Sequence, residues 1–389
     1  MKVFRFILLF GIASVLFFMS GCNDTPNSIG NGSLNKKVDY GNVVIDTFYA
    51  TDHSSLPNLI YTSSTDRFML GKVKTYQAWT CLKFYSWPDS LIGARITSAT
   101  IQLKGLYHFG DSTASLSFDA LRAIASLAND SLTYDSLTLN SSYYYKSNPI
   151  SILPFIPIGD TESITITILD TTMLREWFST NTDTMHLNDG LIFRPTNSNI
   201  IKGFYSFNNS DTSLVPTLFV NYIDTNGNSL TYTHKTGYSK YISTVNQASL
   251  LTDNNLIYIQ NGISYRGLVS FDSIAKISTN WPVSIFRAVL QVTSSGSFSV
   301  SHDSLYLLSV GSTGVSDGVS YALSQRDTSG GHTMYSFDAR QIALRWLSNA
   351  SIRKAALSGY AENASFDLFK LYGTGVNRPR IIITYSLQR

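Results

Sequence analysis

The chain has 389 residues, of which only 14% are charged while 13% are aromatic. A net charge of +3 gives no electrostatic reason to expect nucleic-acid binding, because a polyphosphate backbone selects strongly basic surfaces. The 23 Tyr and 22 Phe, with many Ser, Thr and Asn between them, favour β-strands over helices with charged surfaces.

The first 22 residues divide into a basic, an apolar and a small-residue part. Lys2 and Arg5 come first, residues 6–18 are almost wholly apolar, and small residues precede Cys22. This pattern resembles a bacterial lipoprotein signal peptide with its lipobox. The resemblance implies that residues 1–21 are removed and that Cys22 is lipidated (palmitate being the typical acyl group), which anchors the chain in the cell envelope. A membrane-spanning helix is the alternative, but the apolar run is shorter than the roughly 20 residues that a span needs.

We expect the anchor to lie in the outer membrane, although the residues after Cys22 leave the inner membrane open as well. Residues 22–42 are rich in Asn, Ser, Gly and Thr without an apolar period, and they are predicted to form a flexible tether. Apart from Cys22 the chain has one cysteine, Cys81. No intramolecular disulfide is therefore expected, and the fold must depend on the size of its core.

Strand signals dominate from residue 43 onward. Residues 163–169 alternate Ile with Ser or Thr, which is the period of a half-buried strand, and residues 97–103 alternate in part. About 350 residues remain after the signal and tether, which suggests two domains. The segment Asp224–Asn228 has the composition of a turn, so we place the domain junction there.

The two halves share four landmarks in the same order. Two strand-like segments are followed by a short helix candidate and by a final run that begins with Pro and ends with Tyr. Each helix candidate starts at an Asp that can cap it and carries a Trp, Trp177 or Trp346, on an apolar stripe that predicts a core position. The sequence thus predicts an all-β chain of two tandem β-sandwich (jelly-roll-like) domains with one short helix each, at residues 43–224 and 231–389.

Each half resembles a DNRLRE-type domain, the group that includes carbohydrate-binding module family 96. Residues 266–272 fit the first conserved strand of that family and residues 96–103 fit the second, whereas residues 79–84 fit less well because Trp79 stands where the pattern has Arg. Residues 204–206 fit a late segment, but the Arg-Glu pair that should follow is absent. The resemblance implies a β-sandwich on an exported surface protein, polysaccharide binding in some members, and no catalytic residues.

Motifs that carry chemistry are otherwise scarce. The six His are scattered, and the sequence lacks H-x-x-x-H and C-x-x-C spacings. The Gly-rich residues 311–318 lack Lys and are predicted to form a loop rather than a phosphate site. Asp46, Asp52 and Asp66 could supply oxygen ligands to a structural calcium, but without EF-hand-like spacing they are better explained as solvated acids. We therefore expect no cofactor, no metal site and no catalytic residues.

Aromatic side chains are the remaining binding candidates, because sugar rings stack on them. Tyr143, Tyr144 and Tyr145 occupy a polar stretch, and three consecutive tyrosines cannot all face one core from a strand. Trp87 precedes a Pro-Asp pair typical of a loop, and Trp79 alternates with core positions, which predicts that it lies on the outer face of a sheet.

Three functions from different classes follow from these patterns. The first is a non-catalytic lipoprotein that binds polysaccharide through its two modules. The second is a structural or adhesion module of the cell surface that binds protein partners. The third, an enzyme acting on polysaccharide, would need two carboxylates or a Tyr, His and Arg cluster in a cleft. The sequence favours them in that order, with the membrane as partner through the anchor and no nucleic acid.

Overall fold

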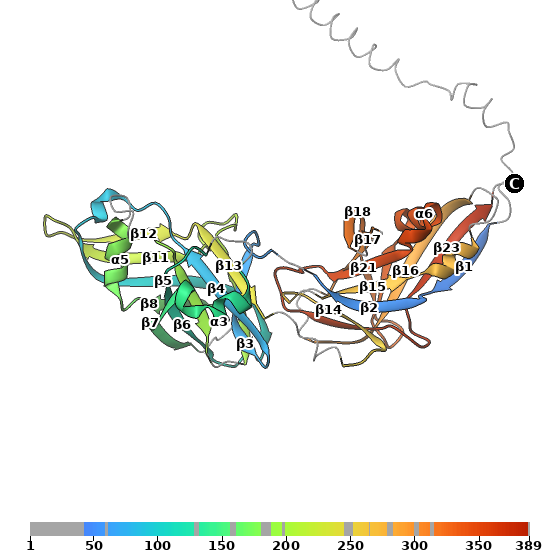
Figure 1. The fold of residues 1–389 in the computed structure, drawn as a ribbon, viewed down its shortest axis with the longest axis horizontal. Coiled ribbons are helices and arrows are strands. Elements are labelled where there is room, and N and C mark those ends of the chain that lie inside the picture. The colour runs from blue at the N-terminus through green and yellow to red at the C-terminus, as the bar shows by residue number, and fades with distance from the viewer. Residues whose placement is uncertain are drawn as a thin grey trace, which may run out of the picture.

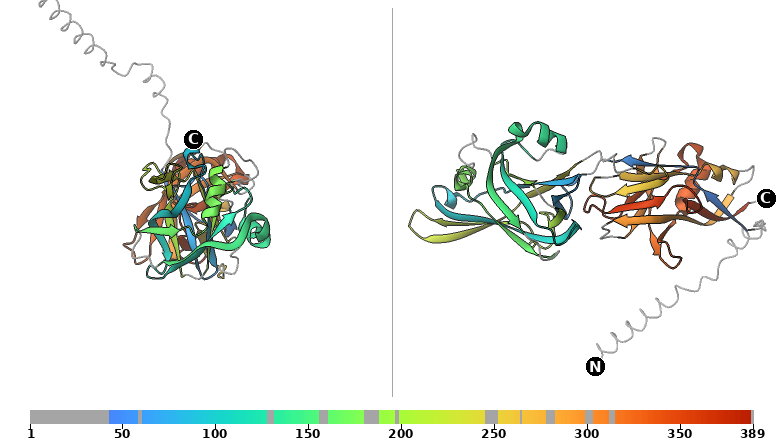
Figure 2. Two further views of the ribbon diagram at one scale, coloured as in Figure 1. Left: turned by 90° about the vertical axis from the view of Figure 1, so that its left-hand side faces the viewer. Right: turned by 90° about the horizontal axis from the view of Figure 1, so that it is seen from below.

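The computed structural model describes residues 43–387 with the exception of residues 59–60, 128–131, 156–160, 180–187, 197–198, 245–251, 264, 278–282, 299–302 and 312–314. Two β-rich bodies lie end to end along the long axis of the molecule (Figure 1), and the two further views confirm this arrangement (Figure 2). The predicted signal peptide, the tether and the lipidation site Cys22 lie outside the described residues.

Domain A comprises residues 61–244. Its helices are η1 (Asp89–Leu91), α3 (Tyr134–Leu139), α4 (Ser141–Tyr144) and α5 (Thr171–Phe178). Its strands are β3 (Arg67–Val73), β4 (Tyr76–Lys83), β5 (Arg95–Gly110), β6 (Leu116–Ala123), β7 (Tyr145–Phe155), β8 (Ser163–Thr167), β9 (Leu191–Pro195), β10 (Ile200–Tyr205), β11 (Thr217–Ile223), β12 (Ser229–Lys235) and β13 (Tyr238–Ser243).

Domain B comprises residues 43–57 and 252–387. Its helices are η4 (Asp272–Lys276), α6 (Arg340–Ser348) and η5 (Ala350–Ile352). Its strands are β1 (Val44–Tyr49), β2 (Asp52–Pro57), β14 (Leu256–Gln260), β15 (Tyr265–Ser270), β16 (Val283–Phe298), β17 (Leu305–Val310), β18 (Ser316–Leu323), β19 (Gln325–Asp327), β20 (Met334–Asp338), β21 (Lys354–Gly359), β22 (Leu368–Tyr372) and β23 (Arg380–Leu387).

Local sequence patterns account for many of these elements. Strand β8 alternates exposed Ser or Thr with buried Ile, as predicted. Helix α5 begins where the Asp170 carboxylate accepts hydrogen bonds from the backbone N–H groups of Thr172 and Met173, at 3.0 and 3.3 Å. Each helix buries its tryptophan: Trp177 and Trp346 are both 1% exposed, which confirms the predicted core positions.

Within the described residues, domain A forms an 11-stranded antiparallel sheet and domain B a 12-stranded one. The 16-residue strands β5 and β16 pair with one set of strands over their first part and with another over their last, so each sheet curls around its own core. The result is two β-sandwich-like halves with few short helices, which confirms the predicted fold class.

The two sheets have the same strand order. It reads β12-β11-β5-β10-β3-β4-β9-β6-β7 in domain A and β1-β23-β16-β22-β14-β15-β21-β17-β18 in domain B. The side strands correspond too, because β13 pairs with β4 as β2 pairs with β15, and β8 pairs with β5 as β20 pairs with β16. This correspondence is what a tandem duplication produces.

The duplicated units have exchanged their first two strands. In the sequence, β1 and β2 open the first repeat, yet they pair with β23 and β15 of the second. Strands β12 and β13 open the second repeat, yet they pair with β11 and β4 of the first. In Figure 1 the blue strands β1 and β2 accordingly lie among the orange and red strands of domain B. Domain A is therefore one continuous segment inserted into domain B.

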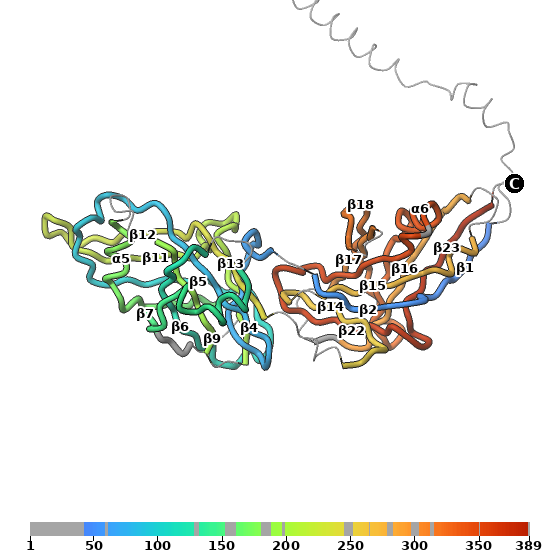
Figure 3. The backbone as a smooth tube through the Cα atoms, in the orientation of Figure 1, coloured from blue at the N-terminus to red at the C-terminus, as the bar shows by residue number. Residues whose placement is uncertain are grey.

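The predicted boundaries, 43–224 and 231–389, delimit the sequence repeats but are wrong as limits of the folded domains. Asp224–Asn228 is a tight turn inside the β11–β12 hairpin: the Asp224 carboxylate accepts from the N–H groups of Asn226 and Asn228, and Gly227 has a φ of 86°. The chain crosses between domains after β2 and again after β13 (Figure 3). A turn composition marks a reversal of the chain and does not distinguish a hairpin from a linker.

Side chains of both domains interlock at the junction. Phe366, fully buried in the loop before β22, packs against Phe109 and Tyr241 of domain A at ring-centre distances of 5.8 and 6.2 Å. The Tyr107 hydroxyl accepts from the Phe366 N–H at 2.9 Å and donates to the Asp367 carboxylate at 3.3 Å. Buried aromatic and hydrogen-bonded contacts of this kind fix the two domains against each other.

Cys81 is free and buried, and burial raises the pKa of its thiol to about 12. Across the part of the chain that the structure describes, no helix combines the length and apolar character that crossing a membrane requires.

Candidate functional site

Tyr143, Tyr144 and Tyr145 lie where α4 meets β7, rather than in an extended polar loop. Tyr143 is 67% exposed and Tyr145 is only 6% exposed. Tyr144 is half-buried, and its ring meets the ring of Tyr143 edge-on. The expectation that at least one of the three faces solvent is confirmed by Tyr143. A single exposed ring at a helix end, however, makes no extended platform.

Trp79 does lie on the outer face of the domain A sheet, but it is 4% exposed. Helix α3 and the start of β7 cover it, with ring-centre distances of 5.9 Å to Tyr134 and 6.1 Å to Tyr145. Trp79, Tyr145 and Cys81 thus belong to a second, smaller core on this face. Trp79 and Tyr145 were predicted as binding residues, and their burial removes the ring face that a sugar would need.

Trp87 follows β4 in a loop, as predicted, but its side chain points into the main core of domain A and is 4% exposed. It stacks on Trp177 at 6.1 Å and meets Phe178 and His234 at 5.0 and 4.7 Å. The prediction that Trp87 is a ligand-facing residue is therefore wrong. An aromatic residue in a loop anchors that loop when the core beneath it has room for a large ring.

The structure instead brings exposed tyrosines together beside the domain junction. A hollow of about 470 Å³ is lined by Asn58 and Tyr61 on one side and by residues of domain B on the other. Its lining includes Tyr61, Tyr306 and Tyr360. Tyr61 is 55% exposed and Tyr360 49% exposed, so both rings remain open to solvent.

Three tyrosines form a continuous row, which we call the tyrosine strip. Tyr360 stacks on Tyr306 at a ring-centre distance of 5.5 Å with planes 25° apart, and Tyr306 meets Tyr321 edge-on at 6.1 Å. Tyr321 is the most open of them, at 74% exposure. The tyrosine strip offers apolar ring faces with hydroxyl groups at their tips, a combination that suits an amphipathic ligand.

The strand register explains why these rings share one face. In β17, Leu305 and Leu307 are fully buried, so the alternating Tyr306 faces outward. Tyr306 lies opposite Ser358 in β21, and Tyr321 in β18 lies opposite Leu308, two positions further along β17. The two tyrosines are therefore diagonal neighbours, within reach of long side chains.

Polar side chains border the same hollow. Arg266 donates from Nε and Nη2 to the two carboxylate oxygens of Glu362, at 2.7 and 2.6 Å. Asn58 Nδ2 donates to Glu362 Oε1 at 3.4 Å. A bidentate pair of this geometry holds both side chains in fixed positions and leaves little net charge in the hollow.

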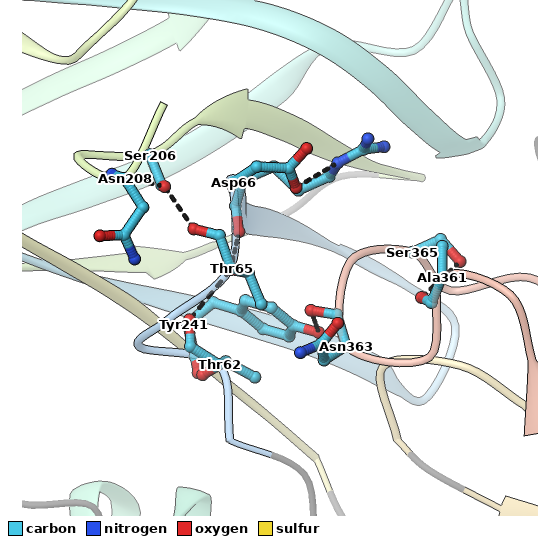
Figure 4. A network of polar contacts seen from close by, with 10 residues as sticks. Thr62, Thr65, Asp66, Ser206, Asn208, Tyr241, Ala361, Asn363 and Ser365 are labelled. Atoms are coloured by element: carbon cyan, nitrogen blue, oxygen red, sulfur yellow. Dashed lines mark hydrogen bonds and ion pairs between the residues drawn. The ribbon is translucent and has the colours of Figure 1, made fainter. Parts of the chain in front are cut away.

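The loop that carries Glu362 is tied to domain A (Figure 4). The Tyr241 hydroxyl donates to the Asn363 carbonyl oxygen at 2.9 Å, and Asn363 Nδ2 donates to the Tyr61 carbonyl oxygen at 3.4 Å. Burial raises the pKa of Tyr241 well above its usual range, so the hydroxyl stays protonated and remains a donor. Residues of both domains thus define one wall of the hollow.

Sequence reasoning missed this site because its residues come from separate segments. Tyr61, Tyr306, Tyr321 and Tyr360 carry no common spacing, and a tyrosine alternating with buried residues in a strand looks the same on a covered face as on an open one. None of the predicted binding residues lines the hollow.

The residues considered for calcium lie apart. Asp46 accepts from the Tyr385 hydroxyl at 2.8 Å, and Asp66 pairs with Arg67 at 3.3 Å in the other domain. Among the residues described, no three His, Cys, Asp or Glu side chains gather as a metal site would require.

No family model matches the sequence, and no curated protein matches it. Among solved structures, one chain described as BspA_C_WT aligns over 87% of this chain and 91% of its own length, with 9% identity and a TM-score of 0.17. A likeness at this TM-score supports no argument about fold or function.

Proposed function

We propose that this protein is a lipoprotein of the cell envelope, anchored in the outer membrane through Cys22, that binds polysaccharide without catalysis. We also propose that its two repeats are DNRLRE-type modules related to carbohydrate-binding module family 96. The observation that carries the binding proposal is the tyrosine strip beside the junction hollow, where Tyr306, Tyr321 and Tyr360 make consecutive ring contacts.

The composition of the hollow suits a sugar. Pyranose rings present C–H faces that pack on aromatic rings, while their hydroxyl groups need donors and acceptors in fixed positions. Tyr360 and Tyr61 supply exposed rings, and the Arg266–Glu362 pair together with Asn58 supplies the polar groups. Because the two charges face each other, the hollow favours neutral sugars over charged ones.

A binding role fits the hollow better than glycoside hydrolysis. A pair of carboxylates is the usual requirement for that reaction. Glu362 is the one acidic side chain among the lining residues, and both of its oxygens accept from Arg266. A carboxylate held in this way is a poor general acid or nucleophile.

The test is a screen of the chain from residue 38 onward against insoluble polysaccharides and a glycan array, followed by the variant Tyr360→Ala. Loss of one stacking ring is expected to weaken binding about five- to thirtyfold, with little change in melting temperature because Tyr360 is half-exposed. Tyr143→Ala removes a comparably exposed ring far along domain A and is the matched control. Equal binding by the Tyr360→Ala variant and the unaltered chain would refute the assignment of this site.

A structural or adhesion role is the second candidate, and edge strand β18 favours it. Within the described residues β18 pairs only with β17, and it exposes Val319, Tyr321 and Leu323, at 66, 74 and 48%. Open apolar strand edges are sites where an extended segment of a partner can add a strand. A folded chain that captures no glycan but binds a surface protein, and loses that protein when Val319→Lys is introduced, would establish this alternative.

A further inference from the structure

A second hollow lies on domain B, beside β16, β19, β20 and the start of β23. Its volume is about 220 Å³, and its lining includes Gln291, Asp327, His332, Arg378 and Arg380. In β23, Ile381 and Ile383 are fully buried, so the alternating Arg380 faces outward from the sandwich. The tyrosine strip lies on β17, β18 and the end of β21, and the two hollows share no lining residue, so they are separate sites.

Both arginines are positioned by neutral groups. Arg380 Nε donates to the side-chain oxygen of Gln291 at 2.9 Å, which fixes the guanidinium plane and leaves the Nη groups available. The Arg378 guanidinium lies 4.7 Å from the centre of the Tyr49 ring. Among the residues that the structure describes, neither Arg378 nor Arg380 forms an ion pair with an acid.

Other arginines of domain B differ in this respect. Arg266 and Arg345 pair with Glu362 and Asp317, both at 2.6 Å. Their charges are balanced within the fold, whereas those of Arg378 and Arg380 are not. Two guanidinium groups held in place without a carboxylate present a fork of donors that matches an oxyanion.

The net charge of the hollow is positive. Asp327 is its one carboxylate, and the Ser329 N–H donates to it at 2.8 Å, which lowers the pKa of Asp327 and keeps it ionised. Two arginines against one aspartate leave about one positive charge at neutral pH. The hollow has room for one small group rather than for a run of sugars.

We propose that this hollow binds an acidic sugar residue, whose carboxylate or sulfate ester is held by Arg378 and Arg380. The site is independent of the neutral-sugar site proposed above and goes beyond it, because the two hollows have no lining residue in common. A polymer that carries both neutral and acidic residues could then engage domain B at two points. Each contact would raise the effective concentration of the other.

The test is titration calorimetry of the full chain, purified in a neutral detergent, with glucuronate, a monosaccharide sulfate and uncharged glucose. Saturable binding of the acidic sugars but not of glucose is expected. Arg380→Gln and Arg378→Gln should each weaken that binding roughly tenfold or more, since each removes charge-assisted hydrogen bonds. Arg287→Gln is the matched control, because Arg287 is exposed on the same sheet face further along β16 and does not line the hollow.

Several outcomes would overturn the proposal. Acidic sugars that do not bind a demonstrably folded chain would refute it, as would equal losses in the Arg380→Gln and Arg287→Gln variants, which would indicate general electrostatic attraction. Binding of vesicles with anionic phospholipid, without binding of glucuronate or the sugar sulfate, would reassign the hollow to lipid phosphate. Variants that keep their melting temperature but lose acidic-sugar binding would support the site even if the screen on the tyrosine strip fails.

Discussion

Replacing Phe48 by alanine tests whether the exchanged N-terminal strands hold domain B together. Phe48 is the side chain of β1 that enters the main core of domain B, where it is 7% exposed. It lies opposite Ile381 in β23, at the other end of the sequence. If β1 closes the sandwich, this contact must contribute to the stability of domain B as any internal core contact does.

The expected loss follows from the buried area. A buried phenylalanine removes roughly 150–250 Å² from water, which at about 25 cal/mol per Å² corresponds to about 4–6 kcal/mol. Alanine retains part of that contribution, and core Phe→Ala replacements cost about 3–5 kcal/mol. We therefore expect Phe48→Ala to lower the free energy of unfolding by about 3–5 kcal/mol. Because a domain is usually stable by about 5–15 kcal/mol, this is a large fraction of the total.

Urea unfolding followed by tryptophan fluorescence measures this loss. Trp346 reports on domain B, whereas Trp79, Trp87 and Trp177 report on domain A. Thr47→Ala, an exposed position on the same strand, is the control and is expected to change stability by less than about 0.5 kcal/mol. If Phe48→Ala lowers the free energy of unfolding by less than about 1 kcal/mol, domain B is stable without the core contact of β1. That result would refute the conclusion that the exchanged strand holds domain B together.

Two smaller changes test local interactions. Asp170→Ala removes the N-cap of α5 and is expected to cost about 1 kcal/mol in urea unfolding; an unchanged midpoint would contradict the capping role. Arg345, which pairs with Asp317 at 2.6 Å, holds the pKa of that carboxyl well below its usual range. The pair therefore stabilises the fold above the unfolded pKa of about 4 and loses that effect as pH falls through the folded pKa. The stability difference between the unaltered chain and Asp317→Asn should narrow below about pH 4, and a pH-independent difference would contradict the charge argument.

Local elements could be predicted because their causes are local. The alternation in β8, the carboxylate of Asp170 at the start of α5 and the apolar stripe ending in Trp177 each depend on side chains within about ten residues of one another. Periodicity and capping are properties of such short windows. The four landmarks shared by the two halves likewise indicated a duplication.

The choice of strand partners could not be predicted in the same way. His234 in β12 lies opposite Leu218, just as Phe48 in β1 lies opposite Ile381. A repeat sequence therefore fits either sandwich, and its local pattern is the same whichever one it joins. The connections between strands determine which sandwich each repeat strand joins. The tight turn at Asp224–Asn228 places β12 directly beside β11, so the corresponding edge of domain B is closed by β1 instead.

The binding residues could not be predicted from the sequence for a related reason. Trp79 was expected on an outer sheet face and does lie there, but α3 (Tyr134–Leu139) folds back over that face and buries it. Tyr306 is half-buried and Tyr360 is exposed, and both line an open hollow rather than a covered face. Whether a sheet face is covered depends on contacts between distant segments of the chain. The alternation of apolar and polar residues within one strand does not reveal those contacts.

Strand exchange also connects the closure of domain B to the proposed site. Strands β1 and β2 run along domain B, and Asn58, which follows β2 directly, lines the hollow together with Tyr61. The segment that closes domain B is therefore the segment that supplies one wall of the hollow. A chain in which β2 leaves β15 would lose the Asn58 contact to Glu362 along with the strand pairing. The pairing of β2 and the Asn58 side of the proposed site therefore depend on each other, so we expect a loss of stability in β1 to weaken the proposed glycan binding as well.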